Sequence, residues 1–270
     1  MYSGTLNYTE RGEGLPIVLI HGFPFDRRIW NEQMEGVSSV GRVIALDLPG
    51  FGQSAEFPRG MEPRMEDYAQ AIADFVRDRD LGQIILVGHS MGGYVAMAFA
   101  RRYSEMLAGM VLVATRVGAD RKAARQNRMA LADDVRSRGA MAVVVSMLSK
   151  LFAAGNVGRD PGLSERLREI MMEQSSEGII AGLHAMASRP NSGGVIKSLQ
   201  IPMLVIAGAQ DAIIRERAVR AISRSAQSST FVSVPDAGHM PMMENPAMFN
   251  EALRVFRCGL PHMYKPPGCP

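Results

Sequence analysis

One serine of the sequence stands in a pattern that is typical of an activated nucleophile. Residues 88–92 read Gly-His-Ser-Met-Gly and fit the pattern G-x-S-x-G around Ser90. An apolar run, 84–87, precedes them, and a segment of helical character, 91–103, follows. A sharp turn from a strand into a helix lifts a serine Oγ above the edge of a sheet, and the glycines let neighbouring backbone pass closely. The pattern therefore predicts a nucleophilic serine at the start of a helix, whose N–H groups would face the developing negative charge.

A serine hydroxyl needs a base to take its proton, and the base needs a third group to fix its tautomer. His239 is the candidate base, because it lies in a Gly- and Pro-flanked loop just past the last apolar run. Asp211 is the candidate acid, since it ends the stretch 203–211 at the carboxyl end of another predicted strand. Asp236 and Asp47 are the alternative acids, although Asp236 is close enough to His239 to brace its own loop instead.

The other titratable residues do not suggest a metal or cofactor site. The remaining histidines are interpreted as structural or surface residues, and they are His21, His89, His184 and His262. No H-x-x-x-H spacing occurs, and the glycine loop 50–52 is too short to cradle a phosphate or a dinucleotide. We therefore expect no metal and no cofactor.

The elements that must position these residues follow from short apolar runs separated by helical segments. Such runs occur at 15–20, 42–47, 83–88, 108–114, 202–208 and 230–234, with helical spacing at 67–80, 91–103 and 245–257. Continuous apolarity is typical of strands buried on both faces, so the alternation predicts a mostly parallel sheet between helices. Residues 116–195 are helical without a convincing strand. The prediction is a core formed by 1–115 and 196–270 that holds a helical insertion, 116–195.

Composition excludes several classes of protein. The chain has 270 residues, 47% of them hydrophobic, and a formal net charge of +3 with its basic residues scattered. It is therefore expected to be globular, and nucleic acid and membranes are poor candidate partners. The opening residues lack the features of a signal peptide. Cys258 and Cys269 are interpreted as free thiols in a reducing compartment, which predicts a cytoplasmic protein. The sequence does not determine the oligomeric state.

With these motifs the sequence resembles the α/β-hydrolase superfamily, in particular its capped small esterases and enol-lactonases. Residues 21–24, His-Gly-Phe-Pro, resemble the oxyanion loop of that superfamily, and residues 47–54 resemble its next strand-end turn. The resemblance implies an α/β-hydrolase fold with a helical cap, and a structural role for His21. It also implies that the backbone N–H groups of Phe23 and Met91 hold the oxyanion, each worth about 3 kcal/mol of transition-state stabilisation.

The function implied by this resemblance is hydrolysis of a small carboxylic ester or lactone through an acyl-enzyme. The alternatives are a hydrolase-fold ligand receptor that turns over slowly or not at all, and a carbon–carbon bond hydrolase that uses the same triad. Met240, His184 and Arg125 are candidate pocket residues. Arg125 shares one helical face with Arg121 and Arg128, which could meet a substrate carboxylate. We expect this face to turn to water, because the cap offers a buried arginine no clear partner, and the substrate to be a neutral ester.

Overall fold

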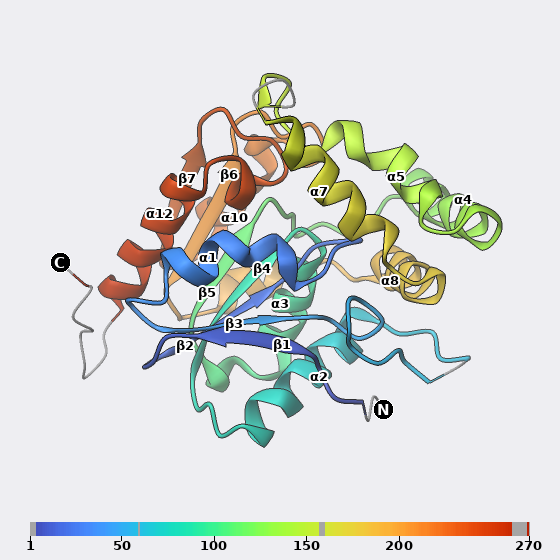
Figure 1. Cartoon of the computed structure of the whole chain (residues 1–270). Coiled ribbons are helices and arrows are strands. Elements are labelled where there is room, and N and C mark those ends of the chain that lie inside the picture. Colours follow the sequence, from blue (N-terminus) through green and yellow to red (C-terminus); the bar gives the residue numbers. More distant parts are fainter. Residues whose placement is uncertain (1–3, 59, 157–159, 261–268, 270) are drawn as a thin grey trace.

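The computed structural model describes residues 4–58, 60–156, 160–260 and 269. Its centre is a seven-stranded sheet in the order β1-β3-β2-β4-β5-β6-β7 (Figure 1). All neighbouring strands run parallel except β1, which pairs with β3 antiparallel. The strands are β1 Tyr8–Arg11, β2 Pro16–Ile20, β3 Arg42–Leu46, β4 Ile84–His89, β5 Leu107–Val113, β6 Met203–Gly208 and β7 Ser229–Val234. The predicted mostly parallel sheet is confirmed.

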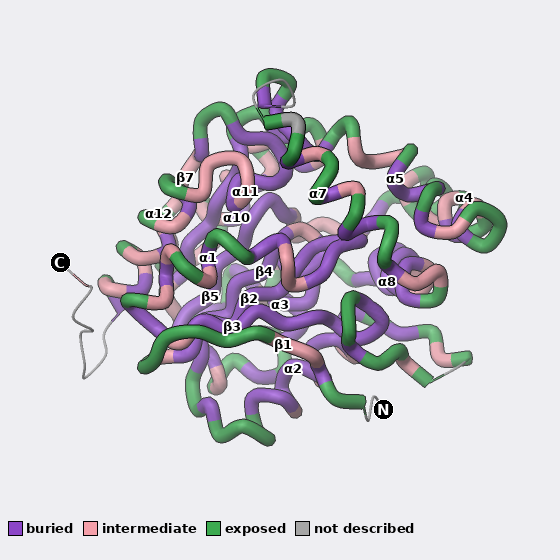
Figure 2. Tube along the Cα trace, viewed as in Figure 1, coloured by how far each residue is buried: buried purple, intermediate pink, exposed green. Residues whose placement is uncertain are grey.

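The central strands are apolar along their whole length because both faces of the sheet are covered. Every residue of β2, β4 and β6 is buried, as Figure 2 shows for the middle of the molecule. The edge strand β1 is polar and largely exposed, so it carries no continuous apolar run. For this reason the sequence pattern did not predict it.

Two layers of helices cover the sheet (Figure 1). In one layer α2 packs on α3, and α9 lies between α3 and α10; in the other, α1, α11 and α12 pack on one another. The helices are α1 Asn31–Gly36, α2 Met65–Asp78, α3 Met91–Arg102, α9 Gly193–Ser198, α10 Glu216–Ser225, α11 Pro241–Glu244 and α12 Pro246–Gly259. Because α3 begins directly after β4, the end of that strand and the start of that helix meet at the carboxyl edge of the sheet.

The described residues between β5 and β6 form helices and no strand. Four of these helices lie together beyond one end of the sheet: α4 Lys122–Arg138, α5 Met141–Met147, α7 Pro161–Met172 and α8 Ser176–Ser188 (Figure 1). We call the described residues of 116–195 the cap. Within it α4 packs on α8 and on α5, and α5 packs on α7. Helix α9 spans the predicted boundary at 195 and packs on α3 and α10.

A buried carboxylate ties the two ends of the cap together. Asp120 precedes α4, and its side chain accepts hydrogen bonds from Arg116, Arg128 and Arg189. Arg189 follows α8, is itself buried, and places its guanidinium 4.0 Å from the centre of the Tyr94 ring. Burial alone would raise the pKa of Asp120, but the hydrogen bonds from Arg189 and Arg128 outweigh it and lower that pKa to about 2. The expectation that the cap offers its arginines no partner was therefore wrong, because Asp120 is that partner.

Replacing this carboxylate should destabilise the fold. We expect Asp120→Asn to lower the free energy of unfolding by about 3 kcal/mol, because the buried charge of Arg189 loses its counter-charge. Since folding lowers the pKa from 3.8, the charge of Asp120 stabilises the fold above that pH and stops doing so as the pH falls towards 2. Urea denaturation at pH 7 and at steps down to pH 2 measures both effects.

The matched control is Asp133→Asn, which removes an exposed partner of Arg136 on α4. Exposed ion pairs contribute about 1 kcal/mol or less, so this variant should unfold close to wild type. Two results would contradict this role of Asp120. One is an equal loss of unfolding free energy in both variants, and the other is a difference in unfolding free energy between Asp120→Asn and wild type that does not shrink between pH 4 and pH 2.

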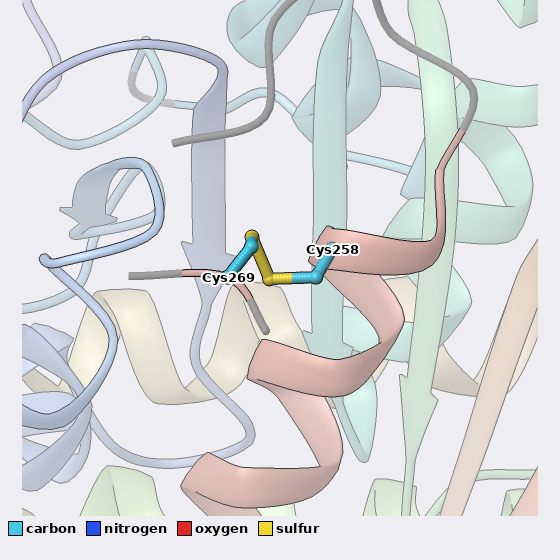
Figure 3. The surroundings of a disulfide bond; sticks show 2 residues. All are labelled: Cys258 and Cys269. Atoms are coloured by element: carbon cyan, nitrogen blue, oxygen red, sulfur yellow. A yellow bond between two sulfur atoms is a disulfide. The ribbon is translucent and has the colours of Figure 1, made fainter. Parts of the chain in front are cut away.

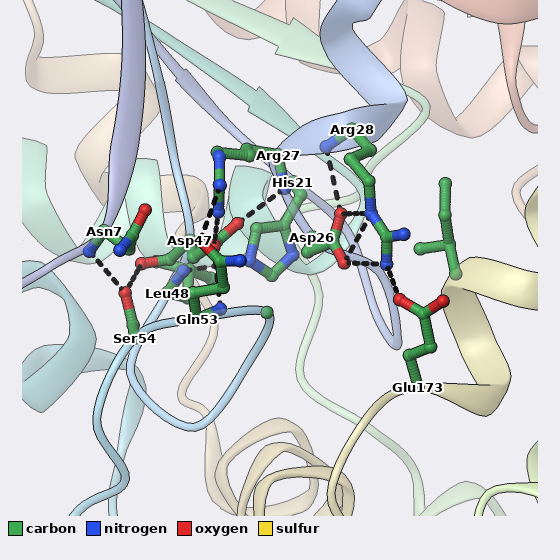
Figure 4. A network of polar contacts seen from close by, with 12 residues as sticks. Asn7, His21, Asp26, Arg27, Arg28, Asp47, Leu48, Gln53, Ser54 and Glu173 are labelled. Carbon is green, nitrogen blue, oxygen red and sulfur yellow. Dashed lines mark hydrogen bonds and ion pairs between the residues drawn. The ribbon is translucent and has the colours of Figure 1, made fainter.

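The cap also contacts the loops that follow β2 and β3. Glu173 bonds Arg28 at 2.6 Å, next to the ion pair between Arg28 and Asp26 (Figure 4). The Gln174 amide donates to Asp26 Oδ2 at 3.0 Å, and its oxygen accepts from Gly52 N–H at 2.9 Å. These contacts hold the α7–α8 junction against the loop that begins at His21.

The C-terminal cysteines correct one prediction. Cys258, on α12, and Cys269 form a disulfide, with their Cα atoms 5.4 Å apart (Figure 3). The free-thiol interpretation was wrong, because Cys269 lies beside the end of α12, within disulfide range of Cys258. The two cysteines are 11 positions apart in the sequence, so the bond joins Cys269 to the end of α12 and does not link parts of the core. The cytoplasmic expectation rested partly on free thiols and stays a prediction. In the described part of the chain no helix is both long and apolar enough to cross a membrane.

Candidate active site

Ser90 lies on the turn between β4 and α3 in a strained backbone conformation. Its φ is 50° and its ψ is −108°, a region that non-glycine residues rarely adopt. Its N–H donates to the Val113 carbonyl at 2.9 Å, and its carbonyl accepts from Thr115 Oγ1 at 2.8 Å. A Cβ on Gly92 would lie 2.6 Å from the Ile20 carbonyl oxygen, so only glycine fits there. The surrounding backbone therefore holds the serine in this conformation.

His239 and Asp211 form a continuous hydrogen-bond chain with Ser90. His239 Nε2 lies 3.0 Å from Ser90 Oγ, and His239 Nδ1 donates to Asp211 Oδ2 at 2.8 Å. The other carboxylate oxygen, Asp211 Oδ1, accepts from the backbone N–H groups of Ile213 at 2.7 Å and Ile214 at 2.8 Å. Histidine and aspartate are both buried, whereas the serine is half-buried. This hydrogen-bond chain fixes the His239 tautomer in which Nε2 is free to accept the proton of Ser90.

The alternative acids lie in other networks. Asp47 is buried and accepts from the N–H and guanidinium of Arg27 and from Gln53 N–H (Figure 4). Asp236 is exposed at a turn with a φ of 54°, and Gln210 Nε2 lies 3.4 Å from its carboxylate. Of these aspartates, Asp211 is the one whose side chain bonds His239.

Two further histidines near Ser90 are held by the backbone. His21 donates from Nδ1 to the Gly22 carbonyl at 2.8 Å. Its Nε2 accepts from Leu48 N–H at 2.9 Å (Figure 4). Burial lowers the pKa of His21, so the ring is a neutral brace between two loops. His89 donates from Nε2 to the His239 carbonyl at 2.8 Å, and burial and its neighbour His239 lower the pKa of His89 well below its usual value. His262 lies outside the described residues.

The loop of Gly22 and Phe23 passes directly beside the serine. A Cβ built on Gly22 would lie 3.2 Å from Ser90 Cβ, and Met91 is the first residue of α3. The Phe23 ring lies under the cap, since a Cβ on Gly182 of α8 would be 3.1 Å from it. The backbone N–H of Phe23, in this loop, and that of Met91, at the start of α3, could therefore face the same oxyanion. This role of the two N–H groups stays a prediction.

The three candidate pocket residues have different surroundings in the structure, and their role in a pocket stays a prediction. Met240 follows His239 and is fully buried. His184, on α8, is half-buried and lines a cavity of about 650 Å³ between that helix and the loop around Phe57. Arg125 is exposed on α4, donates to the Asp120 carbonyl and lines a separate surface hollow. Among the described residues, no group of three or more His, Cys, Asp or Glu side chains is placed to hold a metal ion.

Sequence reasoning did not single out Glu244, which braces the loop of His239. Its carboxylate accepts from the N–H groups of Gly238 and Met240, on either side of the histidine. The only sequence signal is its place, a glutamate five residues after His239 and just before the Asn-Pro that begins α12. That signal could not be interpreted without the contacts.

Comparison with known proteins places this geometry in a family. The sequence profile of the alpha/beta hydrolase family matches residues 17–252, a stretch that includes Ser90, Asp211 and His239. The chain belongs to the alpha/beta hydrolase family.

Three known proteins are similar to this chain to different degrees. A thermophilic esterase from Thermogutta terrifontis, solved with malate bound, is 38% identical, with a TM-score of 0.90 over 92% of this chain and 91% of that one. The enol-lactonase from Burkholderia xenovorans LB400 is 22% identical, with a TM-score of 0.85 over 93% and 95% of the two chains, a likeness of fold. The dihydrolipoyllysine-residue acetyltransferase component of the acetoin cleaving system from Pseudomonas putida is 31% identical over 252 residues, 90% of this chain, and the match spans 63% of its length.

Proposed function

We propose that this hydrolase cleaves a small carboxylic ester or lactone through an acyl-enzyme on Ser90. The observation that carries the proposal is the hydrogen-bond chain from Ser90 Oγ through His239 to Asp211. The 38% identical esterase from Thermogutta terrifontis supports the bond type. Dehalogenases and epoxide hydrolases of similar architecture use an aspartate nucleophile where this chain has Ser90, which disfavours those reactions.

The geometry suits a two-step acyl transfer. His239 Nε2 would take the proton of Ser90 as its Oγ attacks the carbonyl carbon, while Asp211 stabilises the imidazolium. The N–H groups of Phe23 and Met91 would hold the oxyanion. The imidazolium would then protonate the leaving alkoxide as the ester C–O bond breaks. A water activated by the same histidine would hydrolyse the acyl-enzyme, returning acid and free Ser90.

Two measurements on the wild-type protein test this proposal. A chromogenic short-chain ester reports turnover, and a fluorophosphonate probe followed by peptide mapping reports covalent attachment to Ser90. Turnover together with labelling supports the proposal. Ligand binding with neither would favour the receptor alternative, and cleavage of a carbon–carbon substrate without ester turnover would favour the other hydrolase reaction.

The cap arginines bear on the charge of the substrate. Arg128 already pairs with the carboxylate of Asp120, and Arg125 is exposed and donates to the carbonyl of the same residue. Neither guanidinium is therefore poised to bind a substrate carboxylate, which supports a neutral ester. The malate bound to the Thermogutta esterase makes the acidic alternative worth testing beside it.

We expect a neutral p-nitrophenyl ester to exceed a hemisuccinate analogue in kcat/KM by about tenfold or more. The physical reason is that burying a carboxylate without a cationic partner costs at least about 1–3 kcal/mol. Arg125→Gln should leave the ratio of the two kcat/KM values unchanged. A preference for the acidic ester that disappears in Arg125→Gln would refute the neutral-substrate proposal and leave the ester mechanism standing.

A further inference from the structure

Glu244 joins the loop of His239 to the cap through four hydrogen bonds. Its Oε1 accepts from Gly238 N–H at 2.7 Å and from Met240 N–H at 3.2 Å. Its Oε2 accepts from Ala153 N–H at 2.8 Å and from Asn156 Nδ2 at 2.7 Å. One oxygen of the carboxylate thus bonds the histidine loop, and the other bonds the cap. Each oxygen can accept two hydrogen bonds because it has two lone pairs.

The backbone of His239 itself lies between the same cap segment and the turn of the nucleophile. Its N–H donates to the Leu151 carbonyl at 2.8 Å, and its carbonyl accepts from His89 Nε2 at 2.8 Å. A Cβ on Gly238 would lie 2.6 Å from Ala153 N, so the two segments touch backbone to backbone. The Asn156 amide also donates to the Asp236 carbonyl at 2.6 Å. The position of the histidine therefore depends on residues 151–156 of the cap.

We propose that Glu244 is a positioning residue, which holds His239 within reach of Ser90 and transmits the position of the cap to it. The carboxylate satisfies both backbone donors that flank the histidine, so its loss frees the loop to shift. A displacement of about 1 Å at a reacting group can lower a rate by about 10²-fold. The kinetic part of this inference rests on the proposed function, whereas the structural part does not.

The test compares Glu244→Gln with Glu251→Gln. Glutamine keeps the shape of Glu244, but its NH2 group must face one pair of N–H donors and cannot accept from them. Glu251 is exposed on α12, so its change to glutamine is the matched control. We expect Glu244→Gln to lower kcat by about 10- to 100-fold with KM within about threefold of wild type. Fluorophosphonate labelling should slow by a similar factor while the final labelled fraction stays at the wild-type value.

The labelled fraction separates positioning from folding. A merely structural role would lower the final fraction that reacts and leave the labelling rate of the folded protein unchanged, which would overturn the proposal. Asn156→Ala is the milder second variant, because it removes the two bonds of the Asn156 amide, to Glu244 Oε2 and to the Asp236 carbonyl, and keeps both bonds from Glu244 to the N–H groups that flank His239. It should slow labelling by about threefold to tenfold. Wild-type rates in both variants would also overturn the proposal.

A spectroscopic measurement decides the structural part even if the wild-type protein proves inactive on esters. The Nδ1 proton of His239, bonded to Asp211, should give a low-field proton NMR signal that is absent in His239→Ala. In Glu244→Gln this signal should broaden or vanish through faster exchange with solvent, and in Glu251→Gln it should persist. An unchanged signal in Glu244→Gln refutes the positioning role. An inactive wild type with the expected spectral change refutes the proposed function alone.

Discussion

Alanine in place of Ser90 should lower kcat for ester hydrolysis by about 10⁶-fold and abolish fluorophosphonate labelling. The effect is this large because the acyl-enzyme cannot form without Oγ, and members of such a triad act as one unit. The hydrogen bond from Ser90 Oγ to His239 Nε2, at 3.0 Å, is lost with it. Initial rates with a chromogenic ester, together with mass spectrometry of the probe-treated protein, measure the two effects.

The matched control is Ser137→Ala, at an exposed serine of α4 whose hydroxyl donates to the Asp134 carbonyl. It should keep wild-type turnover and labelling. Thermal unfolding of Ser90→Ala should remain close to wild type, because the hydrogen bonds of the Ser90 backbone do not involve the hydroxyl. Labelling that persists in Ser90→Ala would place the nucleophile elsewhere.

The sheet could be predicted from the sequence because burial on both faces leaves a continuous apolar run. Strands β2 to β7 each lie within one or two residues of a predicted run. The turn after β4 was predictable for a different reason, since the close approach of Gly92 to the backbone of Ile20 admits only glycine. Position at a strand end then selected Asp211 and His239 before any distance was known.

Elements with little buried apolar surface escaped prediction. Strand β1 is an exposed edge, and α10 buries only Val219 and Ile222 on an otherwise polar helix. Neither element has enough consecutive apolar residues for its sequence to be distinguished from that of a loop. The disulfide was missed because it depends on where Cys269 lies relative to α12, which the spacing of the two cysteines does not determine.

The contacts that hold the cap could not be predicted for a further reason: they join residues far apart in the sequence. Asp120 meets Arg189 across 69 residues, and Asn156 meets Glu244 across 88. An arginine-rich helix face looks solvated until a buried carboxylate is placed beside it. A prediction from residue types can therefore locate the reacting groups and still miss the groups that keep them in position.

Asp211→Asn should lower kcat/KM by about 10⁴-fold and leave the fold intact. The structure determines the orientation of the new amide. The N–H groups of Ile213 and Ile214 both donate to Oδ1, so the asparagine oxygen must stay on that side. Its NH2 group then faces His239 Nδ1 and donates to it, which moves the ring proton to Nε2. In that tautomer the imidazole cannot accept the proton of Ser90.

Asp236→Asn is the matched control, because Asp236 is the exposed aspartate three residues before His239 and has no bond to the imidazole among the described contacts. It should keep kcat/KM within about threefold of wild type, as surface substitutions of this kind change little. Initial rates and the rate constant of fluorophosphonate labelling should fall together in Asp211→Asn, since both depend on proton transfer from Ser90. Full activity in that variant, with loss in Asp236→Asn or Asp47→Asn, would transfer the role of the acid to one of those residues.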